Sequence, residues 1–112
     1  MNNFKTYLKE NFKTFKLDEV GGSGYYSSFN KEVDGCEIAI VLDFFKSGKL
    51  CEIHISILYM DVRLTNVYEK QDIKKIYSDG ISGKDFFESA INELKSRVEQ
   101  HCGKNPSNGT SS

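Results

Sequence analysis

Aromatic and aliphatic residues recur at helical spacing near the start of the chain and predict a first helix over residues 3–15. Asn2 or Asn3 can cap its start, since asparagine side chains accept hydrogen bonds from the first turn. The segment GGSG at residues 21–24 then predicts a loop between this helix and a sheet. The apolar face of the helix is formed by Phe4, Tyr7, Leu8, Phe12 and Phe15.

Two hairpins are predicted over residues 25–59, where strand-like segments flank turn residues. Asp34-Gly35 is a strong signal for a tight hairpin turn. If Val33 faces Cys36 across this turn, the residue numbers of every facing pair in the hairpin sum to 69. The second turn lies within residues 46–49, and pairing Phe45 with Leu50 across it gives a sum of 95. These two sums fix which residues face each other along all three strands.

The two registers place the apolar residues of all three strands on one face, because successive side chains of a strand point to opposite sides. Lys31 is the one misfit on this face. Agreement of three segments on a single core face favours the sheet. The predicted core face carries Tyr25, Phe29, Val33, Cys36, Ile38, Ile40, Leu42, Phe44, Cys51, Ile53, Ile55, Ile57 and Tyr59.

The remainder of the chain contains one clear helix. Ser82, with Asp85 three residues later, resembles a capping box, and an apolar stripe follows from Phe86 to Val98. Gly103 suits the end of this helix. Residues 61–70 fit either a fourth strand or a bent continuation of the third, and residues 72–77 fit a short helical turn or a strand end. Residues 104–112 carry no apolar side chain, which predicts a disordered tail.

These patterns predict a single α+β domain over residues 1–103. Its small antiparallel sheet has three or four strands, and the N- and C-terminal helices pack on one face. The chain has 112 residues and a net charge of −1, so no global charge attracts it to nucleic acid or to a membrane. Three cysteines, an odd number, and a polar start without a signal segment favour a reduced cytoplasmic protein with no cofactor.

The segment CEIHISILY at residues 51–59 holds a Cys-x-x-His spacing that raises the question of a metal site. Residues three apart on a regular strand point to opposite faces, so Cys51 is expected in the core and His54 on the other side. Cys36 lies opposite Tyr59, far from Cys51 along the sheet. We therefore expect no metal site and interpret Cys36 and Cys51 as small buried hydrophobic residues.

The open face, turned away from the core, collects acidic side chains. Residues 18–45 contain six acidic residues and one lysine. The face is either a solvated polar surface, a docking surface for a basic partner, or a catalytic site in which carboxylates work with His54 as base. The candidate partner-binding residues are Tyr26, Glu32, Glu37, Val41, Asp43, Phe45, Glu52 and His54.

The favoured hypothesis is a small non-enzymatic protein that binds a basic, nucleic-acid-handling protein partner through this acidic face and inhibits or regulates it. Its element order, αβββ(β)α, resembles that of many small phage and plasmid proteins, including inhibitors of bacterial nucleases. The resemblance implies an anti-defence inhibitor of the anti-CRISPR kind. A dimer through the open face is an additional possibility.

Two other functions compete with this hypothesis. The first helix can carry a lysine stripe that binds nucleic acid directly. The open-face carboxylates and His54 can instead serve a small hydrolase. The predicted lysine stripe consists of Lys5, Lys9, Lys13 and Lys16.

Overall fold

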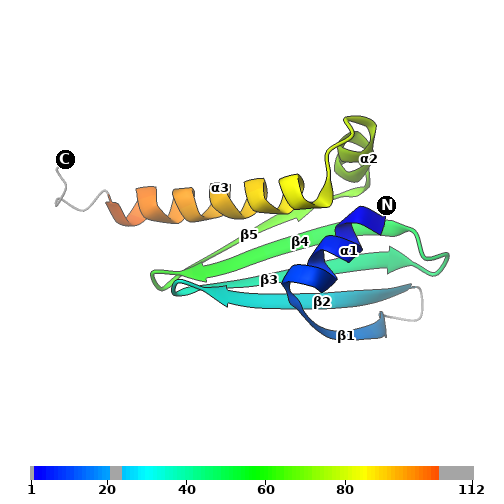
Figure 1. Ribbon diagram of the computed structural model, residues 1–112, viewed down its shortest axis with the longest axis horizontal. Coiled ribbons are helices and arrows are strands. Elements are labelled where there is room, and N and C mark those ends of the chain that lie inside the picture. The colour runs from blue at the N-terminus through cyan, green and yellow to red at the C-terminus, as the bar shows by residue number, and fades with distance from the viewer. Residues whose placement is uncertain (1, 21–23, 104–112) are drawn as a thin grey trace.

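The computed structural model describes residues 2–20 and 24–103 and contains five strands and three helices. All neighbouring strands are antiparallel and follow chain order, so the sheet is a simple meander (Figure 1). The elements are α1 (Asn2–Asn11), β1 (Lys13–Val20), β2 (Gly24–Val33), β3 (Cys36–Phe45), β4 (Leu50–Tyr59), β5 (Val62–Tyr68), α2 (Lys70–Ser78) and α3 (Gly83–Gly103).

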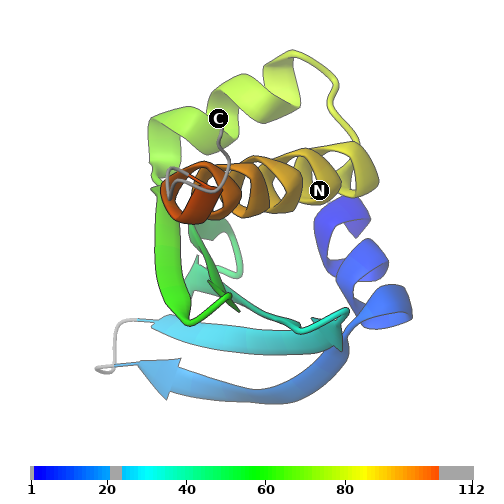
Figure 2. The same cartoon turned by 90° about the vertical axis from the view of Figure 1, so that its left-hand side faces the viewer.

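The sheet is strongly curved, and α1 and α3 lie inside the curve on one face (Figure 2). Phe4 and Leu8 of α1 and Phe87 and Leu94 of α3 are fully buried against the predicted core face of the sheet. The α+β class and the packing of both terminal helices on one face are therefore confirmed. A third helix, α2, follows β5 and contributes Ile73 and Ile76 to the same core.

The first helix is shorter than predicted. It ends at Asn11, and residues 13–20 form β1, so the sheet has five strands rather than three or four. Phe12 still closes the helix, since its backbone N–H donates to the Leu8 carbonyl at 2.7 Å. Beyond it, the backbone pairs with the edge of β2, and such pairing outweighs a weak local helical period. Residues 21–23 of the predicted loop and the predicted tail at 104–112 lie outside the described residues.

The predicted register of the first hairpin is confirmed along all of β2 and β3, from Gly24–Phe45 to Val33–Cys36. Asp34 and Gly35 have φ values of 50° and 77°, as a tight hairpin turn requires. In the second hairpin the sum of 95 is confirmed from Glu37–Leu58 to Asp43–Glu52.

The second register changes next to its turn, where Phe44 rather than Phe45 faces Leu50. The Gly48 N–H donates to the Phe45 carbonyl at 2.8 Å, and Gly48 has a φ of +90°. With this three-residue turn, the facing residue numbers next to the turn sum to 94. Cys51 is an extra, unpaired residue in β4, and beyond it the facing numbers sum to 95. The prediction that Cys51 lies in the core is therefore wrong: Leu50 is buried, and Cys51 is half-buried in a bulge.

The elements left open by the sequence are now defined. Residues 62–68 form the edge strand β5, joined to β4 by a turn in which Met60 and Asp61 have φ values of 52° and 63°. Ser82 caps α3 by accepting a hydrogen bond from the Asp85 N–H at 3.1 Å. Within the described residues, no helix combines the length and apolar character needed to cross a membrane.

Candidate functional site

The open face of the sheet is a regular array of side chains in which each row runs across the strands. One row contains Tyr26, Asp43 and Glu52, and the next contains Val41 and His54. These residues occupy the positions that the sequence predicts, because the two registers hold in this region. The last row contains Glu32, Glu37, Leu58 and Arg63.

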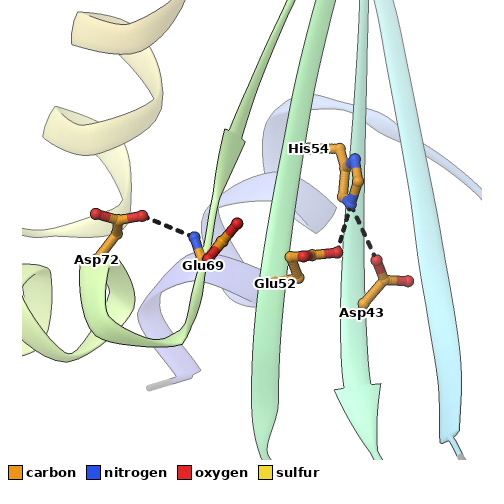
Figure 3. A network of polar contacts seen from close by, with 5 residues as sticks. All are labelled: Asp43, Glu52, His54, Glu69 and Asp72. Atoms are coloured by element: carbon orange, nitrogen blue, oxygen red, sulfur yellow. Dashed lines mark hydrogen bonds and ion pairs between the residues drawn. The ribbon is translucent and has the colours of Figure 1, made fainter.

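Asp43, Glu52 and His54 converge into one polar cluster on this face. His54 Nε2 lies 2.8 Å from Glu52 Oε1 and 3.3 Å from Asp43 Oδ2 (Figure 3). Since ionised carboxylates only accept hydrogen bonds, this nitrogen carries the proton. The histidine thus bridges two acids that face each other across β3 and β4, a pairing that would otherwise be unfavourable. The second polar contact in Figure 3, from Glu69 N–H to Asp72 Oδ2 at 2.8 Å, caps the start of α2.

The cluster lies at the surface but is partly desolvated. The side chains of Asp43, His54 and Glu52 are 28%, 35% and 38% exposed. Burial raises the pKa of Asp43, and the charge of Glu52 raises it further, while His54 lowers it. The pKa of Asp43 is raised overall, so the fold disfavours its ionised form.

The bulge brings Cys51 close to this cluster, which the regular-strand prediction missed. Burial raises the pKa of the Cys51 thiol, and the carboxylates of Asp43 and Glu52 raise it further, against a smaller opposing effect of Lys70. A thiol with a raised pKa is a poor nucleophile at neutral pH. The neighbourhood of a cysteine and a histidine therefore does not form an activated Cys-His pair.

The same three side chains are a possible set of metal ligands. One ligand atom from each of Asp43, Glu52 and His54 lies within 4.8 Å of the others, and no second such group occurs in the described part of the chain. Imidazole nitrogen and carboxylate oxygen are ligands that Zn²⁺ accepts. The proton on His54 accounts for the proximity of these groups without an ion.

The opposite end of the open face contains a hollow of about 430 Å³. Glu32 and Glu37 face each other directly there and are exposed, and neither lies within ion-pair distance of a cation among the described side chains. The side-chain oxygen of Asn30 is buried in the same hollow without a hydrogen-bond partner from the described residues. Arg63 lies at its rim.

Apolar residues flank these charges. Phe45 is 40% exposed at the end of β3, with Lys70 Nζ 5.5 Å from its ring centroid. Val67, opposite His54 on β5, is 46% exposed. The sequence did not identify Asn30, Arg63 or Val67. The last two lie on the strand that remained undecided, and no sequence signal marks a buried amide oxygen that lacks a partner.

The predicted lysine stripe does not lie on one helix. Lys13 and Lys16 belong to β1, because α1 ends at Asn11. Lys5 is half-buried, with its Nζ 5.2 Å from the Phe44 ring centroid, and Lys9 is exposed. The four lysines therefore do not form a continuous helical surface for a phosphate backbone.

Comparison of the chain with protein-family models, curated proteins and solved structures finds no match. The interpretation of the site therefore depends on the geometry of this chain alone.

Proposed function

We propose that the protein is a non-enzymatic binding protein whose open sheet face docks on a basic, nucleic-acid-handling protein and inhibits or regulates it. The hollow that contains Glu32, Glu37 and Asn30 carries this proposal. All three present oxygen acceptors, and the two carboxylates repel each other. A lysine or arginine side chain entering the hollow would pair with both carboxylates and supply the donor that Asn30 lacks.

The spacing of the acidic groups supports a nucleic-acid-handling partner. The Glu32–Glu37 pair and the Asp43–Glu52 pair are six residues apart along β3, which corresponds to roughly 20 Å at the usual strand rise. No single basic side chain spans that distance. A partner must therefore present several cations along a track, as a groove that holds a phosphate backbone does.

The balance of charge and apolar surface also fits docking. On β2 to β5 the open face has four carboxylates, at Glu32, Glu37, Asp43 and Glu52, against Arg63, and exposed Lys13 of β1 adds a second cation beside Asn30. Exposed Phe45 and Val67 add apolar contact area at one end. Charges at such a surface mainly speed association and select partners, whereas the apolar residues slow dissociation.

The first experiment uses octa-arginine as a defined basic probe. Amide shifts of the wild-type protein are followed during titration at low salt, and we expect the changes to concentrate on β2, β3 and β4. The variant Glu32→Lys/Glu37→Lys should lose most of this binding. The matched control is Glu10→Lys/Glu93→Lys, which makes the same charge change at exposed positions on α1 and α3. Equal weakening in both variants would show that net charge, not the open face, binds the probe.

The second experiment tests the partner class. Proteins retained from a bacterial lysate by the wild type should be basic nucleic-acid-binding proteins that added DNA displaces. Glu32→Lys/Glu37→Lys should fail to retain them, and the control variant should retain them. Direct binding of DNA by the purified protein, with strong salt dependence, would instead favour nucleic-acid binding by its lysines.

A further inference from the structure

A second region with the opposite charge lies at the end of the sheet where the β3–β4 turn meets α2. Two adjoining cavities occur there, of about 270 Å³ and 170 Å³, and both are lined by Leu50 and Tyr77. Ligand pockets in proteins usually measure about 300–1,000 Å³, so each cavity alone is small and a ligand must occupy both.

The larger cavity has a rim of lysines over an apolar wall. Lys49 comes from the turn, and Lys70 and Lys74 come from α2. The wall consists of Phe45, Leu50, Ile73 and Tyr77. Lysine ammonium groups bind phosphate as compact point charges, and an exposed phenylalanine ring offers a surface on which a planar ligand can stack.

The smaller cavity adds a fourth lysine and more aromatic surface. Lys5 lines it together with Phe4, Tyr25 and Phe44. The rings of Tyr25 and Phe44 are already stacked on each other at 5.0 Å. Lys5 Nζ lies 5.2 Å from the Phe44 centroid, so an anion near this ring would also meet a cation.

The Tyr77 hydroxyl group is the most informative feature of this region. Its oxygen is buried, and among the described residues it has no hydrogen-bond partner. Burial raises the pKa of Tyr77, so the hydroxyl stays protonated and remains a donor. Buried donors without partners are rare in folded proteins and are costly. Tyr77 lines both cavities, so a small movement of the cavity wall would let a ligand acceptor reach this oxygen and remove the cost.

We propose that these cavities form a binding site for a small aromatic ligand that carries a phosphate group, of the size of a nucleoside monophosphate. The phosphate interacts with Lys49, Lys70 and Lys74, and the ring packs against Phe45 and the apolar wall. The Tyr77 hydroxyl donates to a ligand oxygen. This site goes beyond the proposed docking function and shares only the Phe45 side chain with the open face.

The binding test uses AMP and phenyl phosphate as probes, with adenosine and inorganic phosphate as comparison compounds that lack either the charge or the ring. Amide shifts are recorded at low salt up to millimolar ligand. We expect AMP, phenyl phosphate or both to shift residues of α2 and of the β3–β4 turn, with at least about tenfold weaker binding of adenosine and inorganic phosphate. Binding of AMP alone would identify a nucleotide site, and equal binding of phenyl phosphate would identify a general aryl phosphate site.

The decisive variant is Tyr77→Phe, because it separates a ligand role from a structural role. The free protein should be at least as stable as the wild type, since the hydroxyl satisfies no described partner in the fold. Affinity for the bound probe should fall by about tenfold or more if the hydroxyl donates to its charged oxygen. Tyr59→Phe is the matched control: its hydroxyl donates to Glu99 at 2.9 Å, so its loss should change stability and leave binding unchanged.

The lysines are tested together as Lys49→Gln/Lys70→Gln/Lys74→Gln. This variant should abolish the shifts, while Lys9→Gln/Lys13→Gln/Lys84→Gln, with the same charge change at exposed positions on α1, β1 and α3, should bind as the wild type does. Two results would overturn the proposal: no shift of the pocket residues with either aromatic phosphate, or unchanged affinity in either Tyr77→Phe or the pocket-lysine variant. Shifts with an oligonucleotide but not with AMP or phenyl phosphate would also overturn it, in favour of an extended nucleic-acid surface.

Discussion

The acidic open face and the lysine-rimmed pocket differ in charge and also in how the chain builds them. The open face belongs to β2, β3 and β4, where strict alternation places every side chain once the register is known. The pocket is built by α2, the β3–β4 turn and the first turn of α1, which approach each other only in the folded protein. A surface on regular strands can thus be predicted from two hairpin turns, whereas a pocket between segments of different kinds cannot.

The largest expected effect tests the register on which the open face depends. Ile55 is fully buried opposite Ile40, while the next residue, Ser56, lies on the open face and forms a hydrogen bond with Thr65 at 2.9 Å. Ile55→Ala should lower the free energy of unfolding by about 2–5 kcal/mol, and Ser56→Ala should lower it by less than about 1.5 kcal/mol. Urea denaturation of both variants measures the difference. Equal midpoints would contradict the alternation of faces along β4.

The second effect concerns a turn that the sequence did not mark. Met60 and Asp61 both adopt positive φ, a region that costs a residue with a side chain roughly 1–2 kcal/mol. The double variant Met60→Asn/Asp61→Gly supplies the residues that this turn type favours, so it should stabilise the protein by about 1–2 kcal/mol. Thermal unfolding provides the measurement. Asp34→Asn is the matched control, since the other tight hairpin turn already has glycine at its second position, and it should change stability little. A destabilised double variant would mean that the Met60 side chain has a packing role.

These two turns show why part of the fold was predictable. Asp34-Gly35 indicates a hairpin turn because glycine accepts positive φ without steric cost. The register in which facing residue numbers sum to 69 follows from this turn. Met60-Asp61 gives no such signal, so β5 remained undecided. The helix predicted over residues 3–15 runs into β1, because this strand forms only through pairing with β2, a contact that local sequence preference does not encode.

The candidate site likewise has a part that the sequence predicts and a part that it does not. The neighbourhood of Asp43, Glu52 and His54 follows from the register of 95 alone. The departure of Cys51 from the core does not, because the bulge depends on a three-residue turn that closes one position earlier than expected. The unpartnered Asn30 oxygen and Tyr77 hydroxyl depend on packing in three dimensions, for which periodicity gives no information.

A third prediction uses the bulge to separate the two regions. Deletion of Cys51 keeps the three-residue turn and removes the bulge. In the shortened chain one register then holds along the whole of β4, so Leu50 and Ile53 still point into the core. Stability should change by no more than about 1–2 kcal/mol, and octa-arginine should still bind the open face. The local twist of the strand should decrease. The affinity for an aromatic phosphate beside Leu50 should decrease as a result. Cys51→Ala, which keeps the bulge, is the control and should preserve both. An unfolded deletion variant would show that the bulge is required by the fold.

The smallest expected effect is electrostatic and lies at the boundary between the two regions, where Asp43 faces Glu52 and His54. The pKa of Asp43 is raised, first by burial and then by Glu52, so the folded state binds a proton more tightly than the unfolded state does. Stability linked to this group is therefore greatest below the pKa of the unfolded chain and falls as pH rises through the raised pKa.

Asp43→Asn removes the titration while keeping the shape of the side chain. The variant should be slightly more stable than the wild type at neutral pH, and this advantage should shrink as the pH falls through the raised pKa of Asp43 and vanish below the pKa of the unfolded chain. Urea unfolding of both proteins across this pH range provides the test. A variant that is less stable at neutral pH would show that the contact between Asp43 and His54 outweighs the cost of burial. The cluster would then stabilise the fold rather than destabilise it.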